Sequence, residues 1–339
     1  MDRLLYFCPM APLTITLIQP NLYWEDKAAN LGHLETLVEG IKEKTQLVIL
    51  PEMFSTGFSM RPATLAETMD GPTVAWMKQM AARKKIILTG SLIIEEEGHY
   101  YNRLIWMLPN GQYGTYDKRH RFAYAGEDEH YTPGHRRLIA SVNGWKVNLL
   151  VCYDLRFPVW SRQQMQRSPD EAASSQRPPS PVTQPPASTD LAAGSPSPVT
   201  QPPASPDLPA GSPDPATSPG THPATPAPRS GPAPVAPEYD LLVYVANWPE
   251  RRSHAWKTLL QARAIENQVY VAGVNRVGND GNNIYHSGDS MVIDPLGEVL
   301  YHAHKEESVF TCTLQHEKLE EVRARLPFWK DADQFRIEP

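Results

Sequence analysis

Cysteine is scarce in this sequence of 339 residues, and the three cysteines lie far apart. Cys8, Cys152 and Cys312 form no CxxC pair, which argues against a disulfide framework and against a structural zinc site. Free thiols persist in a reducing compartment. We therefore expect a cytoplasmic protein whose fold needs neither disulfides nor a metal ion.

Clustered positive charge and long apolar stretches are also missing. The net charge is −6 and the pI is near 6.0, with no basic run longer than a few residues, so we expect no nucleic-acid partner. No apolar stretch is long enough to span a membrane. Residues 4–8 are too short for the core of a signal peptide, and Asp2 lies where such a peptide would be basic. We therefore expect a soluble protein with no membrane partner.

Aromatic residues are absent from residues 166–237, a segment of 72 residues that holds 21 of the 34 prolines. Within it, residues 180–196 recur as residues 197–213 with two differences. A duplicated tract of this composition cannot build a core. We predict a disordered Pro/Ser/Ala-rich insertion, which should cost little stability because loop-closure entropy grows only logarithmically with length.

The remaining 267 residues suit one large α/β domain. We expect this domain to comprise residues 12–165 and 238–339. Because Met10 directly precedes the first convincing strand, we assign residues 1–11 to an N-terminal extension.

Apolar runs typical of strands alternate with amphipathic stretches and later follow one another in pairs. This mixture indicates a sandwich of sheets with helices outside. Apolar runs predict strands at residues 13–18, 47–50, 86–89, 91–94, 101–108, 147–151, 239–245, 269–274, 288–293 and 299–302. Helical spacing of apolar residues predicts helices at residues 24–44, 73–85 and 254–267.

Cys152 follows the apolar run 147–151 at the point where a polar turn begins. Ligands bind at the carboxyl ends of strands in open α/β sheets, and backbone N–H groups of a following turn would face the thiol. Such surroundings lower the pKa of a cysteine. For this segment alone, a small buried hydrophobic residue is the plainer interpretation.

Glu52 also follows an apolar run, and Lys118 lies in a long polar and aromatic loop at residues 116–134. A cysteine that hydrolyses an amide needs a base, a donor to the oxyanion and a proton for the leaving amine. His120 and His130 of this loop leave a Cys–His pair as an open alternative. In isolation, a surface-turn glutamate and a solvated lysine are the plainer interpretations.

Five segments carry motifs around these residues. They are LPEMF at residues 50–54, YDKRH at 116–120, LVCYDLRFP at 150–158, ANWPERRSHAWKTLLQARAIENQVYVAGVNRVG at 246–278 and GDSMVIDPLGEVL at 288–300. Together they resemble the nitrilase or C–N hydrolase superfamily, whose catalytic set is a glutamate, a lysine and a cysteine in that chain order. Glu127 matches the second glutamate of this family. The resemblance covers about residues 12–165 and 238–337.

The sequence departs from the family pattern at the insertion and at Arg121, which stands where leucine is usual. The resemblance implies a four-layer α-β-β-α sandwich of the nitrilase type. It also implies a homodimer and a small-molecule amide substrate, with no metal and no organic cofactor.

The resemblance also implies a role for each motif residue. Glu52 takes the thiol proton, and Cys152 attacks the carbonyl carbon of the substrate. The oxyanion lies between the Lys118 ammonium and the backbone N–H of Tyr153. Glu127 holds Lys118 or the hydrolytic water in place, and two carboxylates beside one ammonium leave at least one pKa free to move toward neutrality.

Two aromatic residues and one charged pair complete the expected site. Phe58 and Trp248 are candidate walls of the pocket, although aromatic residues at strand ends are often plain core. Asp154 and Arg156 could brace the turn after the cysteine with an ion pair.

Three further segments, residues 51–60, 247–249 and 330–333, look most like those of bacterial ω-amidases. These enzymes hydrolyse 2-oxoglutaramate and 2-oxosuccinamate to ammonia and the oxo acid. The alternatives are another branch of the family, acting on N-carbamoyl amines, aliphatic amides or nitriles, and a binding scaffold without activity. A carboxylate on the substrate needs a cation, for which the candidates are Arg121, Arg156 and Arg252.

Overall fold

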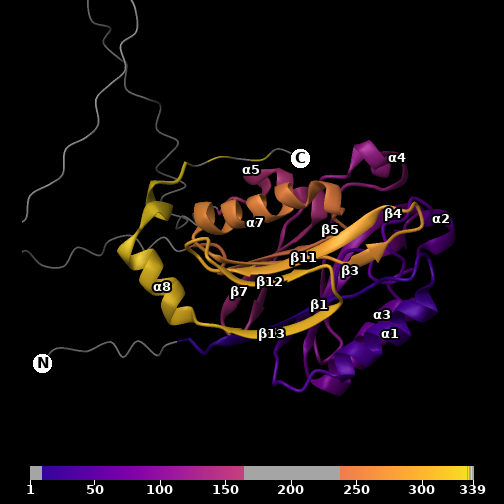
Figure 1. Ribbon diagram of the computed structural model, residues 1–339, viewed down its shortest axis with the longest axis horizontal. Coiled ribbons are helices and arrows are strands. Elements are labelled where there is room, and N and C mark those ends of the chain that lie inside the picture. Colours follow the sequence, from indigo (N-terminus) through magenta and orange to yellow (C-terminus); the bar gives the residue numbers. More distant parts are fainter. Residues whose placement is uncertain (1–9, 164–236, 334, 336, 338–339) are drawn as a thin grey trace, which may run out of the picture. The chain divides into compact units, whose positions relative to one another are not determined.

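The computed structural model describes residues 10–163, 237–333, 335 and 337. Apart from Pro237, the predicted insertion lies outside the described residues, and so does the predicted extension apart from Met10 and Ala11. The described residues form two β-sheets and the helices that cover them (Figure 1).

The first sheet has six strands, and each of its faces supplies a separate core. Leu47 and Ile49 point into the core between the two sheets, whereas Val48 and Leu50 point toward helices, because successive side chains of a strand alternate between its faces. The first three strands in the chain run parallel. The order is β13 (Ser308–Leu314), β1 (Leu13–Gln19), β2 (Leu47–Ile49), β3 (Ile87–Glu96), β4 (His99–Met107) and β5 (Tyr113–Asp117).

The second sheet has seven strands, and its centre is buried on both faces. Strands β7, β8 and β9 run parallel there, and their near-continuous apolar sequences are typical of parallel strands covered on both sides. The order is β10 (Val277–Asn279), β11 (Tyr285–Ile293), β9 (Tyr270–Val274), β8 (Leu241–Val245), β7 (Trp145–Val151) and β6 (Leu138–Val142), and β12 (Val299–His304) pairs with β11.

Helices cover the outer face of each sheet. Leu34 of α1 (Lys27–Glu39) and Met77 of α3 (Pro72–Lys84) pack on the first sheet, and Trp256 of α7 (Ser253–Asn267) packs on the second. Figure 1 shows α7 on one side of the two sheets and α1 and α3 on the other. The predicted α/β sandwich with four layers is therefore confirmed.

Shorter helices lie in the connections and after the last strand. No helix in the described part of the chain is long and apolar enough to cross a membrane. The shorter helices are α2 (Pro62–Leu65), η1 (Ala123–Ala125), α4 (Glu127–His130), η2 (Cys152–Arg156), α5 (Pro158–Ser161), η3 (Glu250–Arg252), α8 (His316–Arg325) and η4 (Phe328–Asp331).

Two differences between the predicted and the observed elements have a clear local cause. The helix predicted at residues 24–44 spans Lys27–Glu39, and it begins there because the Asp26 side chain accepts a hydrogen bond from the backbone N–H of Ala29 and caps the first turn. The strands predicted at residues 86–89 and 91–94 are one strand, because Gly90 continues β3 beside Phe54 instead of making a turn.

Candidate active site

The predicted catalytic residues lie where strands of the two sheets end. Glu52 follows β2 and Lys118 follows β5, both of the first sheet, whereas Cys152 follows β7 of the second. Glu127 begins the short helix α4 in the loop after β5. The face-to-face packing of the sheets therefore brings together residues that are up to 100 positions apart in the chain.

Lys118 lies between the two predicted carboxylates. Its Nζ is 2.9 Å from Oε1 of Glu52 and 2.8 Å from Oε2 of Glu127. Asn102 of β4 donates from Nδ2 to Oε1 of Glu52 at 2.8 Å and to Oε1 of Glu127 at 3.2 Å. All four side chains are buried. A buried charge is stable only where partners compensate it, and here one ammonium and one amide serve two carboxylates.

The charges of this cluster shift the pKa values of its members. Burial acts to lower the pKa of Lys118, but the Glu127 and Glu52 carboxylates more than reverse this, so the pKa is raised and the ammonium stays charged. Burial raises the pKa of Glu127, an effect that Lys118 opposes and Glu52 strengthens. This upward shift agrees with the expectation that one carboxylate pKa moves toward neutrality.

Glu52 is also held from the second sheet. The backbone N–H of Asn247, just after β8, donates to Oε2 of Glu52 at 2.8 Å, and Nδ2 of Asn247 donates to the backbone oxygen of Glu52. Sequence reasoning did not identify Asn102 or Asn247 as members of the site. Asn102 stands beside Arg103 in β4, whose sequence is HYYNRLIWM, so no clear sequence signal separates it from a polar strand residue.

Cys152 is the first residue of η2 and has a φ of 44°, a left-handed conformation that costs energy for any residue other than glycine. Burial raises the pKa of its thiol well above the usual value, the charge of Glu52 adds to this, and Lys118 opposes it. The lowered pKa predicted from the strand-end position is therefore wrong, because the thiol is buried beside a carboxylate. A hydrogen-bonding contribution from the Glu52 side chain also raises the pKa of the thiol, so Glu52 is the candidate base beside the thiol proton.

Asp154 braces the turn after Cys152, but not through Arg156. It accepts hydrogen bonds from the hydroxyl of Tyr116 at 2.7 Å, the backbone N–H of Val151 at 3.0 Å and Nδ1 of His120 at 2.8 Å. The predicted Asp154–Arg156 ion pair is wrong, since these neighbours surround the carboxylate. The alternative of a Cys–His pair also fails for His120, which is bound to Asp154.

His120 also stacks on the ring of Phe157, with the ring centroids 3.8 Å apart. His130, the other histidine considered, is exposed at the end of α4 and does not line the pocket that contains Cys152.

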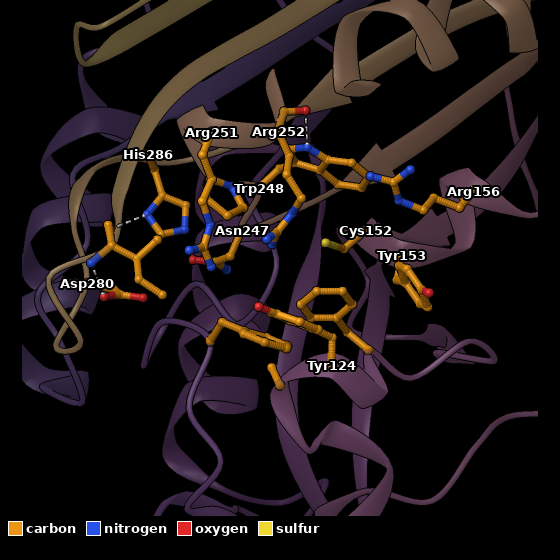
Figure 2. Close-up of a pocket in the computed structure, with 15 residues that line it drawn as sticks. Tyr124, Cys152, Tyr153, Arg156, Asn247, Trp248, Arg251, Arg252, Asp280 and His286 are labelled. Atoms are coloured by element: carbon orange, nitrogen blue, oxygen red, sulfur yellow. Dashed lines mark hydrogen bonds between the residues drawn. The ribbon is translucent and has the colours of Figure 1, made fainter. Parts of the chain in front are cut away.

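The Cys152 thiol opens into a cavity of about 240 Å³ (Figure 2). The three residues predicted to bind the substrate, Phe58, Tyr153 and Trp248, all line it. Further apolar walls come from Phe122, Tyr124, Ala125, Pro249 and Ile284. A small cavity with apolar walls and a few polar groups is typical of a site for a small molecule.

Three arginines and one carboxylate, that of Asp280, give this cavity its charge. Arg156, Arg251 and Arg252 line it (Figure 2), and among the described residues none of their guanidinium groups pairs with a carboxylate. Two of them lie over aromatic rings, Arg156 over Trp248 at 5.1 Å and Arg252 over Phe122 at 4.9 Å. Burial lowers the pKa of Arg252 and the charge of Arg251 adds to this, so Arg252 is a half-buried cation without an anionic partner.

The structure shows which of the three arginines suggested by the sequence lie at the cavity. Arg156 and Arg252 line the cavity, but Arg121 does not, and its Nη1 donates to the backbone oxygens of Asp128 at 3.1 Å and Tyr131 at 3.0 Å. Arg121 therefore stabilises its own loop and does not bind the substrate carboxylate. Arg251 was not considered from the sequence, although it stands beside Arg252 in the same motif.

Comparison with known proteins agrees with this geometry. The family model for carbon–nitrogen hydrolases matches residues 14–170 and 235–324. The chain is 36% identical to the omega-amidase YafV of Escherichia coli (strain K12) over 97% of this chain and 100% of that protein. It is 24% identical to the 2-oxoglutaramate amidase of Bacillus subtilis (strain 168), over 94% and 96% of the two chains.

A solved structure is similar over the same length. The crystal structure of XC1258 from Xanthomonas campestris, a CN-hydrolase superfamily protein with an arsenic adduct in its active site, is 37% identical. It superposes with a TM-score of 0.76 over 97% of this chain and 100% of that one. The chain described here therefore belongs to the carbon–nitrogen hydrolase family of the nitrilase superfamily and is a hydrolase that acts on amides.

Proposed function

We propose that this enzyme hydrolyses the terminal amide of a small ω-amido 2-oxo acid, such as 2-oxoglutaramate or 2-oxosuccinamate, to ammonia and the oxo acid. The observation that carries the proposal is one cavity that contains the Cys152 thiol together with three guanidinium groups that lack carboxylate partners among the described residues. Such a cavity suits a small substrate with an amide at one end and a carboxylate at the other. The names of the relatives given above point to the same substrate class.

The first step forms a thioester. Glu52 accepts the thiol proton, and Sγ of Cys152 attacks the amide carbon to give a tetrahedral intermediate. The Lys118 ammonium and the backbone N–H of Tyr153 stabilise the oxyanion. Because the raised pKa of the thiol keeps it protonated in the resting enzyme, the reaction needs Glu52 as its base.

The intermediate then collapses, and the C–N bond breaks as the nitrogen takes the proton from Glu52. Ammonia leaves and the acyl group stays on Cys152 as a thioester. Glu52 next deprotonates a water molecule that attacks the thioester carbon, and the thiolate takes up that proton when it leaves. Glu127 keeps Lys118 charged and fixed throughout, since its charge makes the largest of the contributions that raise the ammonium pKa.

Arg252 is the guanidinium best suited to the substrate carboxylate. It is half-buried, whereas Arg156 and Arg251 are exposed to solvent. A partly desolvated guanidinium gains most from a carboxylate, which it can bind through two parallel hydrogen bonds. Arg156 and Arg251 then add a positive field at the mouth of the cavity.

The substrate assignment is tested by the release of ammonia from four compounds. We expect kcat/KM for 2-oxoglutaramate to exceed that for a neutral aliphatic amide, an N-carbamoyl amine and a nitrile by roughly a thousandfold or more, because a site built to pair a polar group rejects substrates that lack it. A preference for the carbamoyl amine or the nitrile would assign the enzyme to another branch of the family.

A variant of Arg252 separates recognition of the carboxylate from the chemistry. In Arg252→Met, kcat/KM for 2-oxoglutaramate should fall by roughly a hundredfold, whereas the slow hydrolysis of a neutral amide should change little. Arg136→Met is the matched control, since Arg136 is exposed and lies outside the cavity. Equal losses on both substrates would contradict a role in carboxylate binding.

We further propose, from the family resemblance, that the enzyme is a cytoplasmic homodimer. Cys152 and Cys312 are free cysteines, and a nucleophilic thiol stays reduced in a cytoplasm. Sizing chromatography should give twice the mass of the 38.0 kDa chain, and elution at the monomer mass would contradict the proposal.

A further inference from the structure

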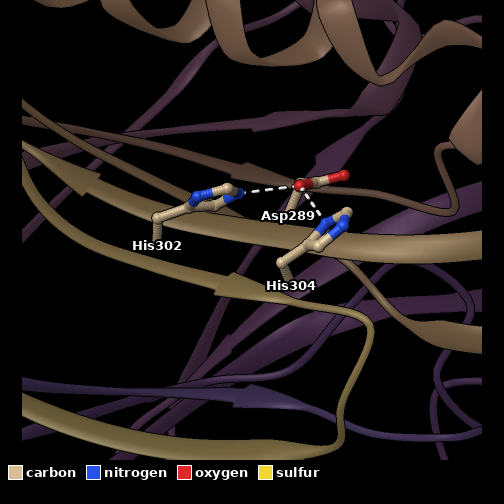
Figure 3. Close-up of side chains that lie close together, drawn as sticks. All are labelled: Asp289, His302 and His304. Carbon is tan, nitrogen blue, oxygen red and sulfur yellow. Dashed lines mark hydrogen bonds and ion pairs between the residues drawn. The ribbon is translucent and has the colours of Figure 1, made fainter.

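A cluster of one carboxylate and two imidazole side chains lies on the hairpin of β11 and β12 (Figure 3). Nε2 of His302 and Nδ1 of His304 lie 2.7 Å and 2.9 Å from the same oxygen, Oδ1 of Asp289. The ligand atoms of the three residues all lie within 4.8 Å of one another. None of the three lines the cavity that contains Cys152, so the proposed hydrolysis does not use them.

The hairpin brings the three side chains together by two local devices. His302 and His304 are two residues apart in β12 and therefore point to the same face. The pairing of β11 with β12 shifts register between Gly288 and Ser290, which leaves Asp289 as an extra residue in a bulge with a φ of 60°. Bulges re-aim side chains and are common at functional sites.

The carboxylate is fixed before any ligand arrives. Asp289 is 1% exposed, its Oδ2 accepts a hydrogen bond from the Ser287 hydroxyl at 2.6 Å, and its backbone oxygen accepts one from Nε1 of Trp256 at 2.7 Å. Burial acts to raise the pKa of Asp289, but the hydrogen bonds from Ser287, His302 and His304 more than offset this, so the pKa is lowered and the group stays ionised. With Oδ2 held by Ser287, Oδ1 faces the two histidine rings.

We propose that Asp289, His302 and His304 form a binding site for a divalent transition-metal ion of the Zn²⁺ class. Two imidazole nitrogens and one carboxylate oxygen are the donors that Zn²⁺ and its neighbours in the first transition row accept. The side chains of His302 and His304 are 33% and 47% exposed, so water can complete the coordination and the ion can exchange. On binding, each ring gives its Oδ1-facing nitrogen lone pair to the metal, and a proton held there is released to solvent.

A lysine competes for the same oxygen. Nζ of Lys257, on α7, lies 3.7 Å from Oδ1 of Asp289 and repels an arriving cation. Its side chain is 35% exposed, which leaves room for it to swing into solvent. This arrangement predicts opposite effects for two kinds of substitution, loss of affinity when a ligand is removed and gain of affinity when Lys257 is neutralised.

The test is titration of the untagged protein with Zn²⁺ by calorimetry and with Co²⁺ by visible absorption. We expect one saturable ion per chain, and a Co²⁺ spectrum without the intense near-ultraviolet band that a thiolate ligand would add. His302→Gln, His304→Gln and Asp289→Asn should each weaken binding by at least about tenfold to a hundredfold. Cys152→Ala should bind as the native chain does.

Two more variants make the result decisive. Lys257→Gln should tighten binding several-fold, and His99→Gln, which removes an exposed histidine outside the cluster, should leave it unchanged. In every variant that still binds, Zn²⁺ should raise the melting temperature, because a ligand of the native state stabilises it. Absence of saturable binding, or binding that survives the loss of His302 and of Asp289, would overturn the proposal.

Discussion

Lys118 is buried between Glu52 and Glu127, and its removal would leave two carboxylates facing each other without a cation. We expect Lys118→Ala to abolish hydrolysis and to lower the free energy of unfolding at pH 8 by about 3–5 kcal/mol. Unfolding in urea and ammonia release measure the two effects. Lys42→Ala, at an exposed lysine, is the control and should change neither.

The loss of stability caused by Lys118→Ala should increase as the pH rises. The pKa of Glu127 is already raised in the folded chain, and Lys118 is the charge that limits the rise. A carboxyl group whose pKa is raised on folding stabilises the fold below its unfolded pKa, and that contribution is lost as the pH rises through the folded pKa. The loss caused by Lys118→Ala should therefore be smaller at pH 5 than at pH 8, and the reverse order would contradict the pairing described here.

Single residues differ in how well the sequence predicts them. Glu52, Lys118 and Cys152 were identified because each stands in a motif at or beside a strand end, and the structure brings all three together. Asn102 was not identified, because its amide reaches the site only through the pairing of β4 within the sheet. The thiol pKa of Cys152 was misjudged for a similar reason, since burial depends on the whole fold.

Gly134 lies in the loop between α4 and β6 and holds the backbone of Lys118 in place. Its backbone N–H donates to the backbone oxygen of Lys118 at 3.0 Å, and a Cβ at this position would lie 2.0 Å from the backbone oxygen of Asp117. Since backbone atoms cannot yield as a flexible side chain can, Gly134→Ala should displace Lys118. We expect the free energy of unfolding to fall by roughly 1–3 kcal/mol. We also expect kcat to fall by a larger factor than the factor by which KM rises.

A second glycine provides the matched control for this substitution. Gly32 lies inside α1, and the methyl group that alanine would add there meets nothing within 4 Å. Gly32→Ala should therefore stabilise the protein by about 0.5–1 kcal/mol without affecting kcat. Thermal melting measures the stability of both variants, and steady-state kinetics measures their kcat and KM. Normal stability and activity of Gly134→Ala would show that Gly134 does not position Lys118.

Helices and strands with a strong apolar pattern were predicted from the sequence. Strands that depend on pairing with a neighbouring strand were missed. Apolar runs indicated β2 and β7, which are buried in the sandwich. Strand β13 was missed, because most of its side chains are not fully buried and it is defined by its pairing with β1. The loop predicted at residues 116–134 holds the end of β5, η1 and α4, whose short lengths leave no periodic signal.

The whole molecule should tolerate removal of the Pro-rich segment, because the chain leaves and re-enters the sandwich at neighbouring points. Oε1 of Gln163 accepts a hydrogen bond from the backbone N–H of Glu238 at 2.7 Å. Replacing residues 166–237 with a short Gly/Ser linker should therefore leave the melting temperature and kcat/KM almost unchanged. Unfolding or loss of activity would show that the segment is a structural part of the enzyme.

The central claim is that Cys152 carries the acyl group of an ω-amido 2-oxo acid during hydrolysis. The most direct measurement is mass spectrometry of the protein quenched in acid during turnover of 2-oxoglutaramate. We predict an adduct with the mass of the substrate less ammonia, located on the peptide that contains Cys152 and absent from Cys152→Ala. An adduct on another residue, or a rate above about a tenth of the native rate in Cys152→Ala, would contradict the account.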